Sequence, residues 1–330
     1  YSPRISFVYS AGANKNHNFR ASFQTGFRNP TTQDLYIGLN LGPFALIGSA
    51  KDNLDRYNEV VNVSQNAQVT LGQPATLPLS GSNAYTNAYT LASVQAFAAS
   101  QNPADLQVAN INLVKPEQVK AFEAGYKSVL GNGLSVDING YYNIYNDFMS
   151  TSRVVSPYYG NVITDPATAI QALGNNDRRI YQVYSNSATE ITSYGFGVGL
   201  SKKVYKNFEL GVNYNHANFD FDQAKDPSFI AGFNTPRHRV KASLSNEDLF
   251  KNFGFAVNGR WTDEYLWQSS FADGTIPATT VFDAQVTYKI PVIKSVLKLS
   301  ASNIGGGDYL QVVGAGRIGQ VYLASLTINP

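Results

Sequence analysis

The sequence has 330 residues, of which 25 are Lys or Arg and 23 are Asp or Glu, so its net charge is only +2. This small charge, with no Lys/Arg cluster, argues against a nucleic-acid partner, and the lack of cysteine excludes disulfides, thiolate metal sites and cysteine nucleophiles. Charged residues make up 15% of the chain, against about a quarter in a typical soluble protein, and aromatic residues reach 13%.

Alternating apolar and polar residues predict strands along most of the chain. We expect eleven strands, at about residues 4–10, 17–25, 117–129, 134–150, 180–203, 207–221, 237–247, 254–265, 279–289, 295–303 and 319–329. In the clearest of them, Leu134, Val136 and Ile138 fall on one face, and Asp137 and Asn139 fall on the other. No apolar run approaches the roughly 18 residues of a membrane helix, so a membrane would be crossed by strands.

The connections between these strands are alternately short and long. The short ones follow the odd strands and lie at Ala11–Asn16, Leu130–Gly133, Val204–Lys206, Glu247–Phe253 and Ile290–Lys294. Short turns at one end and long loops at the other are typical of outer-membrane β-barrels, whose strand numbers are even in single bacterial chains. We therefore predict an all-β fold, an antiparallel transmembrane β-barrel, in which these strands form half of a barrel of about 22 strands.

The longest predicted loop, at about 27–116, contains an uncharged stretch at 60–104 that also lacks histidine. Within this stretch, Leu91, Val94 and Phe97 recur at helical spacing, which predicts a short helix. A loop of more than about 15 residues is usually functional or disordered. Two interpretations stay open: a surface loop packed on its neighbours, or an extracellular lid over a neutral polar ligand or a partner protein.

Three segments resemble motifs of TonB-dependent receptors and occur in the order of that family. The first is similar to Phe-Arg-x-Pro-x-x-x-Glu-Leu-Tyr, with Asp in place of Glu, and its matching residues are Phe27, Arg28, Pro30, Leu35 and Tyr36. The second resembles the Leu-x-Pro-Glu and Glu-x-Gly-x-Lys segment that enters a later strand, through Pro116, Glu117, Glu123 and Gly125. The third is similar to Asn-Leu-Phe-x-x-x-Tyr before the final loop, through Asn303 and Tyr309.

This resemblance covers nearly the whole chain and implies that residues 1–330 are the C-terminal half of the barrel of a Gram-negative outer-membrane transporter. In this family a plug domain fills the barrel, and TonB, energised through ExbB and ExbD, pulls on the plug. This pull drives active uptake of a large nutrient such as an oligosaccharide, a peptide or a metal chelate. The plug and the N-terminal barrel half have no counterpart here, so they would be partners, together with outer-membrane lipid. Polar residues such as Asp137 and Lys241 would face the lumen and contact the plug.

Two stretches, Ile37–Asn40 and Gly48–Tyr57, look most like the Bacteroidota branch of the family, which includes relatives of the SusC type. A SusD-like surface lipoprotein would then be a further partner. The opening residues from Tyr1 form neither an initiator methionine nor a signal peptide, which indicates part of a longer polypeptide. The end at Pro330 departs from the final aromatic residue that is usual for such barrels.

Aromatic residues in the predicted loops are the candidate ligand contacts, because rings can stack on sugars or cover apolar ligand faces. They are Tyr158, Tyr159, Tyr265, Trp267 and Phe271. The alternative is a structural role, since barrels also use aromatic residues in membrane girdles and in loop packing. Arg179, Arg237 and Arg239 would either line an acidic channel or solvate a rim.

Signals for catalysis are poor. His17, His216 and His238 are far apart, with no His-Glu-x-x-His motif and no Asp/His cluster at metal spacing. We therefore predict no enzyme activity, no metal site and no cofactor. Three other functions stay open: a non-transporting scaffold or subunit of a surface complex, a self-contained passive porin with an even strand number, and a secreted sugar-binding sandwich that is soluble without detergent.

Overall fold

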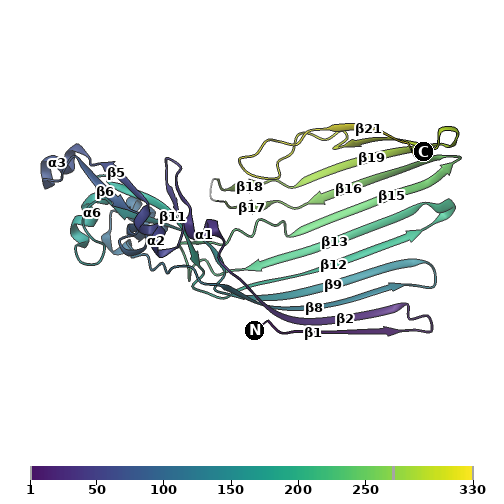
Figure 1. Cartoon of the computed structure of the whole chain (residues 1–330), viewed down its shortest axis with the longest axis horizontal. Coiled ribbons are helices and arrows are strands. Elements are labelled where there is room, and N and C mark those ends of the chain that lie inside the picture. Colours follow the sequence, from purple (N-terminus) through teal and green to yellow (C-terminus); the bar gives the residue numbers. More distant parts are fainter. Residues whose placement is uncertain (1, 270–271, 329–330) are drawn as a thin grey trace.

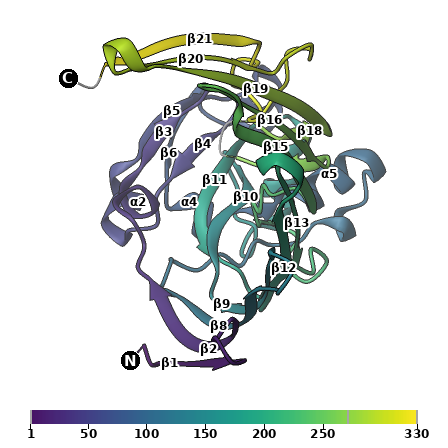
Figure 2. The same cartoon turned by 90° about the vertical axis from the view of Figure 1, so that its right-hand side faces the viewer.

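The computed structural model describes residues 2–269 and 272–328. Eleven long strands form one antiparallel sheet in the order β1-β2-β8-β9-β12-β13-β15-β16-β19-β20-β21 (Figure 1). Their bounds are β1 Arg4–Ala11, β2 His17–Arg28, β8 Glu117–Val129, β9 Leu134–Asn146, β12 Ile191–Lys203, β13 Glu209–Asp220, β15 His238–Phe250, β16 Phe253–Thr262, β19 Thr279–Ile290, β20 Ser295–Ser302 and β21 Val321–Ile328. The sheet curves from β1 at the bottom to β21 at the top (Figure 2), and the predicted all-β antiparallel fold and strand number are confirmed.

The register of the sheet places the alternating residues of neighbouring strands side by side. Ile138 of β9 lies opposite Val198 of β12, and Val198 lies opposite Tyr214 of β13. In the next row, Asn139 and Asn215 lie on either side of a glycine of β12. One face of the sheet is therefore apolar and exposed across neighbouring strands, and the other is polar, as the alternation predicted.

The short connections all lie at one end of the sheet, on the right of Figure 1, and the long ones lie at the other. Two of the short ones contain single 3₁₀ turns, η2 (Tyr205–Asn207) and η3 (Pro291–Ile293). The Gly-Asn-Gly turn between β8 and β9 ends at Gly133, whose φ of 78° suits a residue without Cβ. The predicted alternation of short and long connections is thus confirmed.

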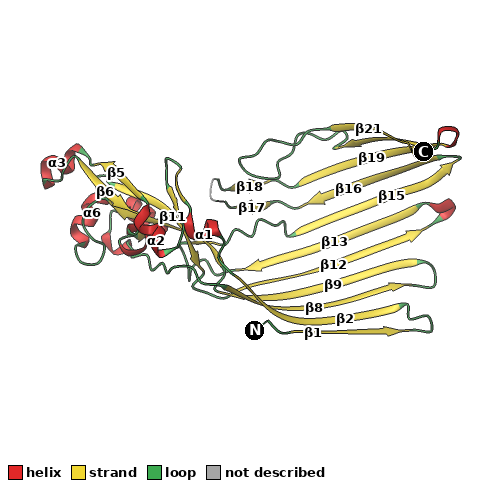
Figure 3. Cartoon of the chain, viewed as in Figure 1, coloured by secondary structure: helices red, strands yellow, loops and turns green. Residues whose placement is uncertain are grey.

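The long connections at residues 29–116 and 147–190 fold together into what we call the loop module, on the left of Figure 3. Its central sheet has the order β14-β10-β11-β4-β3, and β7 also pairs with β10. Its strands are β3 Gly38–Asn40, β4 Ala45–Ile47, β5 Asn58–Asn62, β6 Thr76–Ser80, β7 Tyr89–Thr90, β10 Met149–Pro157 and β11 Arg178–Asn186, with β14 Phe229–Ile230 added from a later connection. Its helices are α1 Thr32–Tyr36, α2 Lys51–Arg56, α3 Gln65–Leu71, α4 Asn83–Thr86, α5 Leu91–Ser100, η1 Pro103–Asp105 and α6 Pro166–Gly174.

The short helix predicted in the uncharged stretch is confirmed as α5, and it buries Val94 and Phe97. The described residues also show the principal packed core in this module, around Ala45, Val154 and Tyr181. This location is physically expected, because one face of the large sheet is exposed and the other is polar. None of the helices formed by the described residues has the length and the apolar character needed to cross a membrane.

Three predicted strands differ from the structure. The strand expected at 180–203 is two strands, β11 in the loop module and β12 in the large sheet, because alternation continues through both and does not reveal which partner each one pairs with. The strand expected at 134–150 ends at Asn146, and Asp147, with a φ of 53°, turns the chain toward β10. The last strand begins at Val321, and residue 329 lies outside the described residues.

Candidate functional site

Arg179 of β11 lies inside the loop module. Its guanidinium donates to Glu59 Oε1 at 2.9 Å, to the carbonyl of Gly42 at 2.7 Å and to Asn40 Oδ1 at 2.9 Å. The side chains of Arg179 and Glu59 are only 10% and 15% exposed. Arg179 therefore joins β11, β5 and the β3–β4 turn, and it neither lines a channel nor solvates a rim. Burial, and then the Glu59 carboxylate, raise the pKa of the neighbouring Tyr181 phenol, which stays a neutral donor.

The predicted ligand contacts Tyr158 and Tyr159 belong to the packing of the same module. Tyr159 is 7% exposed, and its hydroxyl donates to Asp177 Oδ2 at 2.9 Å and accepts from Asn175 Nδ2 at 3.0 Å. Tyr158 is half-buried and packs beside it, on the cluster around Ala172. These contacts support a structural role in loop packing for both tyrosines, the alternative to ligand binding.

Tyr265 and Trp267 lie on the hairpin of β17 (Tyr265–Trp267) and β18 (Gly274–Ile276), which follows β16. The Tyr265 hydroxyl donates to the carbonyl of Gln311 at 3.3 Å, so the hairpin is joined to the last long connection. The Trp267 indole N–H is buried and has no hydrogen-bond partner among the described residues. Phe271 lies outside the described residues. Of the predicted contacts, Tyr265 alone lines two of the hollows, of about 550 and about 380 Å³, that the described residues form.

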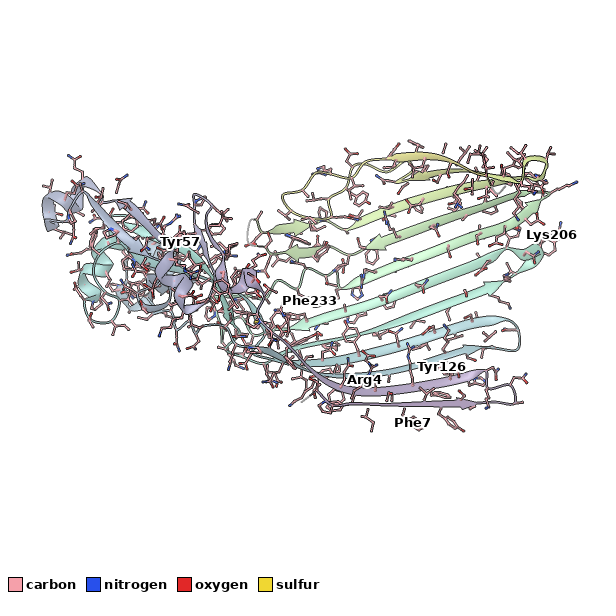
Figure 4. All side chains as sticks on the ribbon, in the orientation of Figure 1. Arg4, Phe7, Tyr57, Tyr126, Lys206 and Phe233 are labelled. Atoms are coloured by element: carbon pink, nitrogen blue, oxygen red, sulfur yellow. The ribbon has the colours of Figure 1, made fainter. Side chains whose placement is uncertain are left out.

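An aromatic cluster at the junction of the large sheet and the loop module was not predicted from the sequence. Phe219 of β13 stacks on Phe233 with ring centres 4.7 Å apart, and Phe148 meets Phe219 edge-on at 5.9 Å. Phe221 contacts Phe229 of β14 at 5.5 Å. Phe233, labelled in Figure 4, lies where the sheet meets the module and lines the larger hollow. The sequence signal, Phe219 and Phe221 two residues apart, gives no hint of the partners. Phe148 comes from the connection after β9, and Phe229 and Phe233 come from farther along the connection after β13.

Arg28 and Glu117, which belong to two different family motifs, meet at the end of neighbouring strands. They lie opposite each other across β2 and β8, and Arg28 Nη2 is 3.1 Å from Glu117 Oε2. Both also hold the start of β10: Arg28 donates to the carbonyl of Met149 at 3.0 Å, and Glu117 accepts from its N–H at 2.9 Å. The first two motifs thus fix the point where the loop module leaves the sheet.

The other motif residues have structural contacts or exposed positions. Asp34 accepts from the N–H of Thr31 at 2.8 Å in a capping box that starts α1, which explains how Asp serves in place of Glu. Asn303 is buried and donates to the carbonyl of Gly307 at 3.1 Å. Of the remaining motif residues, Pro30, Leu35 and Pro116 lie beside the ends of β2, α1 and β8. Glu123 and Gly125 lie on the polar face of β8, and Phe27 and Tyr36 are exposed. Tyr309 lies beside Arg260.

The sequence predicts that the three histidines lie far apart, and for two of them this prediction is wrong. His216 and His238 lie opposite each other across β13 and β15, and their Nδ1 atoms are 3.5 Å apart. Tyr214 Oη lies 2.8 Å from His238 Nδ1, on the apolar face. The antiparallel register brings them together, and this register depends on the length of the long connection between the strands. Across residues 2–269 and 272–328, no three His, Asp or Glu side chains are placed to hold a metal ion.

An antiparallel sheet with one apolar and one polar face, and with short and long connections at opposite ends, defines the wall of a β-barrel. The chain matches the family model described as TonB dependent receptor-like, beta-barrel, over residues 1–304. The protein therefore belongs to the TonB-dependent receptor β-barrel family. This is a family of outer-membrane transport receptors of Gram-negative bacteria and not of enzymes.

Solved structures share this fold. The match to the FrpB iron transporter from Neisseria meningitidis has a TM-score of 0.54 and 13% identity, and it covers 98% of this chain and 37% of that one. The match to a mutant of the ferric enterobactin receptor PfeA from Pseudomonas aeruginosa has a TM-score of 0.58 and 12% identity, and it covers 99% of this chain and 40% of that one. This chain thus spans about two fifths of their length, and identities this low show the fold alone. Among curated proteins, none matches the chain.

Proposed function

We propose that this chain forms the C-terminal half of the barrel of a TonB-dependent transporter that actively takes up a large nutrient. The carrying observation is the eleven-stranded sheet, which has one apolar and one polar face and whose two outermost strands, β1 and β21, are exposed along nearly their whole length. Unpaired backbone groups at a sheet edge are costly in a bilayer. Pairing both edges with further strands of the same polypeptide would close a barrel with an even strand number.

The proposed route for the nutrient runs along the polar face. In this proposal the loop module and the β17–β18 hairpin face the cell exterior and capture the ligand, with Tyr265 and Trp267 among its contacts. The rest of the polypeptide supplies the plug, on which TonB acts with energy from ExbB and ExbD. The nutrient is an oligosaccharide, a peptide or a metal chelate. Among the structural neighbours are an iron transporter and a ferric enterobactin receptor, which makes a metal chelate one candidate for this chain.

The finer subfamily proposal is the Bacteroidota branch with SusC-type relatives. This proposal is supported by the amino-acid sequences of Ile37–Asn40 and Gly48–Tyr57, which form β3 and the segment around α2. A SusD-like lipoprotein would then cover the uncharged part of the loop module, where Val60 and Val69 are strongly exposed.

The first test is the intact mass of the polypeptide from which this chain comes, with peptide mapping upstream of Tyr1. We expect a mass well above 36.0 kDa and peptides of a plug domain. Cells that produce this polypeptide should then take up its nutrient only while the inner membrane is energised. A mass equal to that of this chain contradicts the proposal in favour of a small porin or a soluble module. A plug-containing protein whose deletion leaves energised uptake unchanged contradicts it in favour of a scaffold.

A further inference from the structure

Three basic side chains gather on the polar face of the large sheet. Lys241 of β15 lies directly opposite Arg260 of β16, and Arg239 lies two residues along on the same face. Like charges opposite each other destabilise a sheet. A negatively charged group beside these side chains would offset their repulsion.

The described part of the chain supplies no such partner. Arg239 and Lys241 form no ion pair and no side-chain hydrogen bond there, and their neighbours on β13 are Asn215 and Asn213. The nearest carboxylate on this face of β19 is Asp283, which accepts from Ser302 and from the N–H of Asn303. The three cations also line the hollow of about 380 Å³, whose lining contains no Asp or Glu.

Two tyrosines from long connections also line the hollow. They are Tyr265, from the β17–β18 hairpin, and Tyr309, from the last long connection. Arg260 Nη2 donates to the Tyr309 hydroxyl at 3.0 Å, and the Tyr265 hydroxyl holds the same connection through Gln311. Val281 and Ile276, which are buried, complete the apolar lining of the hollow together with Leu310 and Val312. We call this hollow, with Arg239, Lys241 and Arg260, the basic pocket.

We propose that the basic pocket binds an oxyanionic group, a carboxylate, phosphate or sulfate, that the transported nutrient carries. This inference rests on the proposed function and narrows the nutrient to an anionic one. Guanidinium and ammonium groups form strong charge-assisted hydrogen bonds with oxyanions, and pores for anions and phosphate are lined by Arg and Lys. The volume of about 380 Å³ lies within the range of roughly 300–1,000 Å³ that small-molecule sites occupy. A neutral nutrient would leave the three charges uncompensated.

The test uses the complete, plug-containing polypeptide in detergent, with citrate and pyrophosphate as probes and a neutral oligosaccharide as the comparison ligand. The test variant combines Arg239→Gln, Lys241→Gln and Arg260→Gln. The matched control is Lys298→Gln, which removes an exposed cation on the polar face of β20, opposite Thr287 and Ser325. Calorimetry should show that the wild type and the control bind at least one anion, weakened by salt, and that the triple variant binds at least about tenfold more weakly. Lys241→Arg, which keeps the charge, should retain binding.

Equal anion affinity in the wild type and a folded triple variant overturns the inference, as does a wild type that binds neither anion. If the wild type binds neither anion and the triple variant lowers the melting temperature, the pocket belongs to an acidic side chain of the plug, and the ligand assignment is wrong. The binding assay needs no TonB. If the wild-type polypeptide binds an anion but shows no energised uptake, the proposed function alone is contradicted. If it shows energised uptake but binds no anion, the basic pocket alone is contradicted.

Discussion

The ion pair of Arg179 and Glu59 stabilises the loop module only as a complete pair. Removing two charges from water costs several kcal/mol per ion, and the pair offsets this cost through its own contact and through the hydrogen bonds from Arg179 to Asn40 and Gly42. Loss of one partner leaves the other charge buried without compensation.

Glu59→Ala should therefore lower the free energy of unfolding of the loop module by about 3 kcal/mol. Hydrogen exchange of β5 and β11 in the complete polypeptide measures this loss. The control is Arg56→Ala, which removes an exposed pair with Asp52 and should change the value by no more than about 0.5 kcal/mol. Equal effects of the two substitutions would show that the buried pair has no special role.

Asp226 predicts that local stability depends on pH where the connection after β13 contacts the segment before β12. Its Oδ2 accepts from the N–H of Ala188 at 2.7 Å, and burial raises its pKa above the usual range. A raised pKa in the folded state means that the fold favours the protonated form. The resulting stability is present below the unfolded pKa and is lost as the pH rises through the folded pKa. Amides around Ala188 should thus be better protected at about pH 4 than at about pH 7, after correction for intrinsic exchange. Asp226→Asn should remove this difference, and a difference that survives the substitution has another origin.

Single residues also show how far a candidate site follows from sequence. Tyr159 and Tyr265 look alike in the sequence, since both are aromatic residues in predicted loops. One is buried against Asp177, whereas the other lines two hollows. Burial depends on what the rest of the chain places around a ring, so the sequence alone gave no ground for choosing between them.

Gly195 of β12 illustrates a constraint at the level of the element. A Cβ there would lie far inside the van der Waals contact distance of the His216 carbonyl oxygen and 2.7 Å from the Tyr141 hydroxyl. The backbone of β12 therefore runs too close to its neighbours at Gly195 to leave room for a side chain. At Gly140, on the neighbouring strand, a Cβ would be an ordinary 3.6 Å from the nearest atom.

Gly195→Ala should destabilise the barrel by about 1–3 kcal/mol, the usual cost of overpacking, and Gly140→Ala should change its stability much less. Urea unfolding of the complete polypeptide in lipid vesicles measures both. A Gly195→Ala protein as stable as the Gly140→Ala protein would mean that β12 and β13 can separate enough to admit the methyl group.

The strands themselves were largely predictable because period-two alternation and short turns are local features. The main error came where one alternating stretch forms two strands in different sheets. β11 pairs with β10 and β4 in the loop module, although its alternation continues into β12 of the large sheet. Strand partners are chosen by segments that are distant in the sequence, and these are invisible in a local pattern.

For the whole molecule, the two faces should respond oppositely to charge. Val212 of β13 is exposed on the apolar face, and Asn258 of β16 is exposed on the polar face. In a membrane barrel, Val212→Arg should cost up to about 2–4 kcal/mol, the full value applying at the bilayer midplane, because an arginine facing lipid is poorly solvated. Asn258→Arg should be nearly neutral, since the polar face meets water or the plug. Folding of the complete polypeptide into lipid vesicles measures both, and equal costs would mean that the apolar face does not meet lipid.

The amino-acid sequence determined the class of fold, the number of strands in the large sheet, their two faces and the end at which each connection lies. These features follow from residues that are close together along the chain. The tertiary structure decided which side chains meet: Arg179 with Glu59, His216 with His238, and the three cations of the basic pocket. The first two contacts join segments separated by long connections, and the basic pocket combines the register of the β15–β16 hairpin with tyrosines from two long connections. All of them depend on strand register and loop packing, which no local pattern specifies.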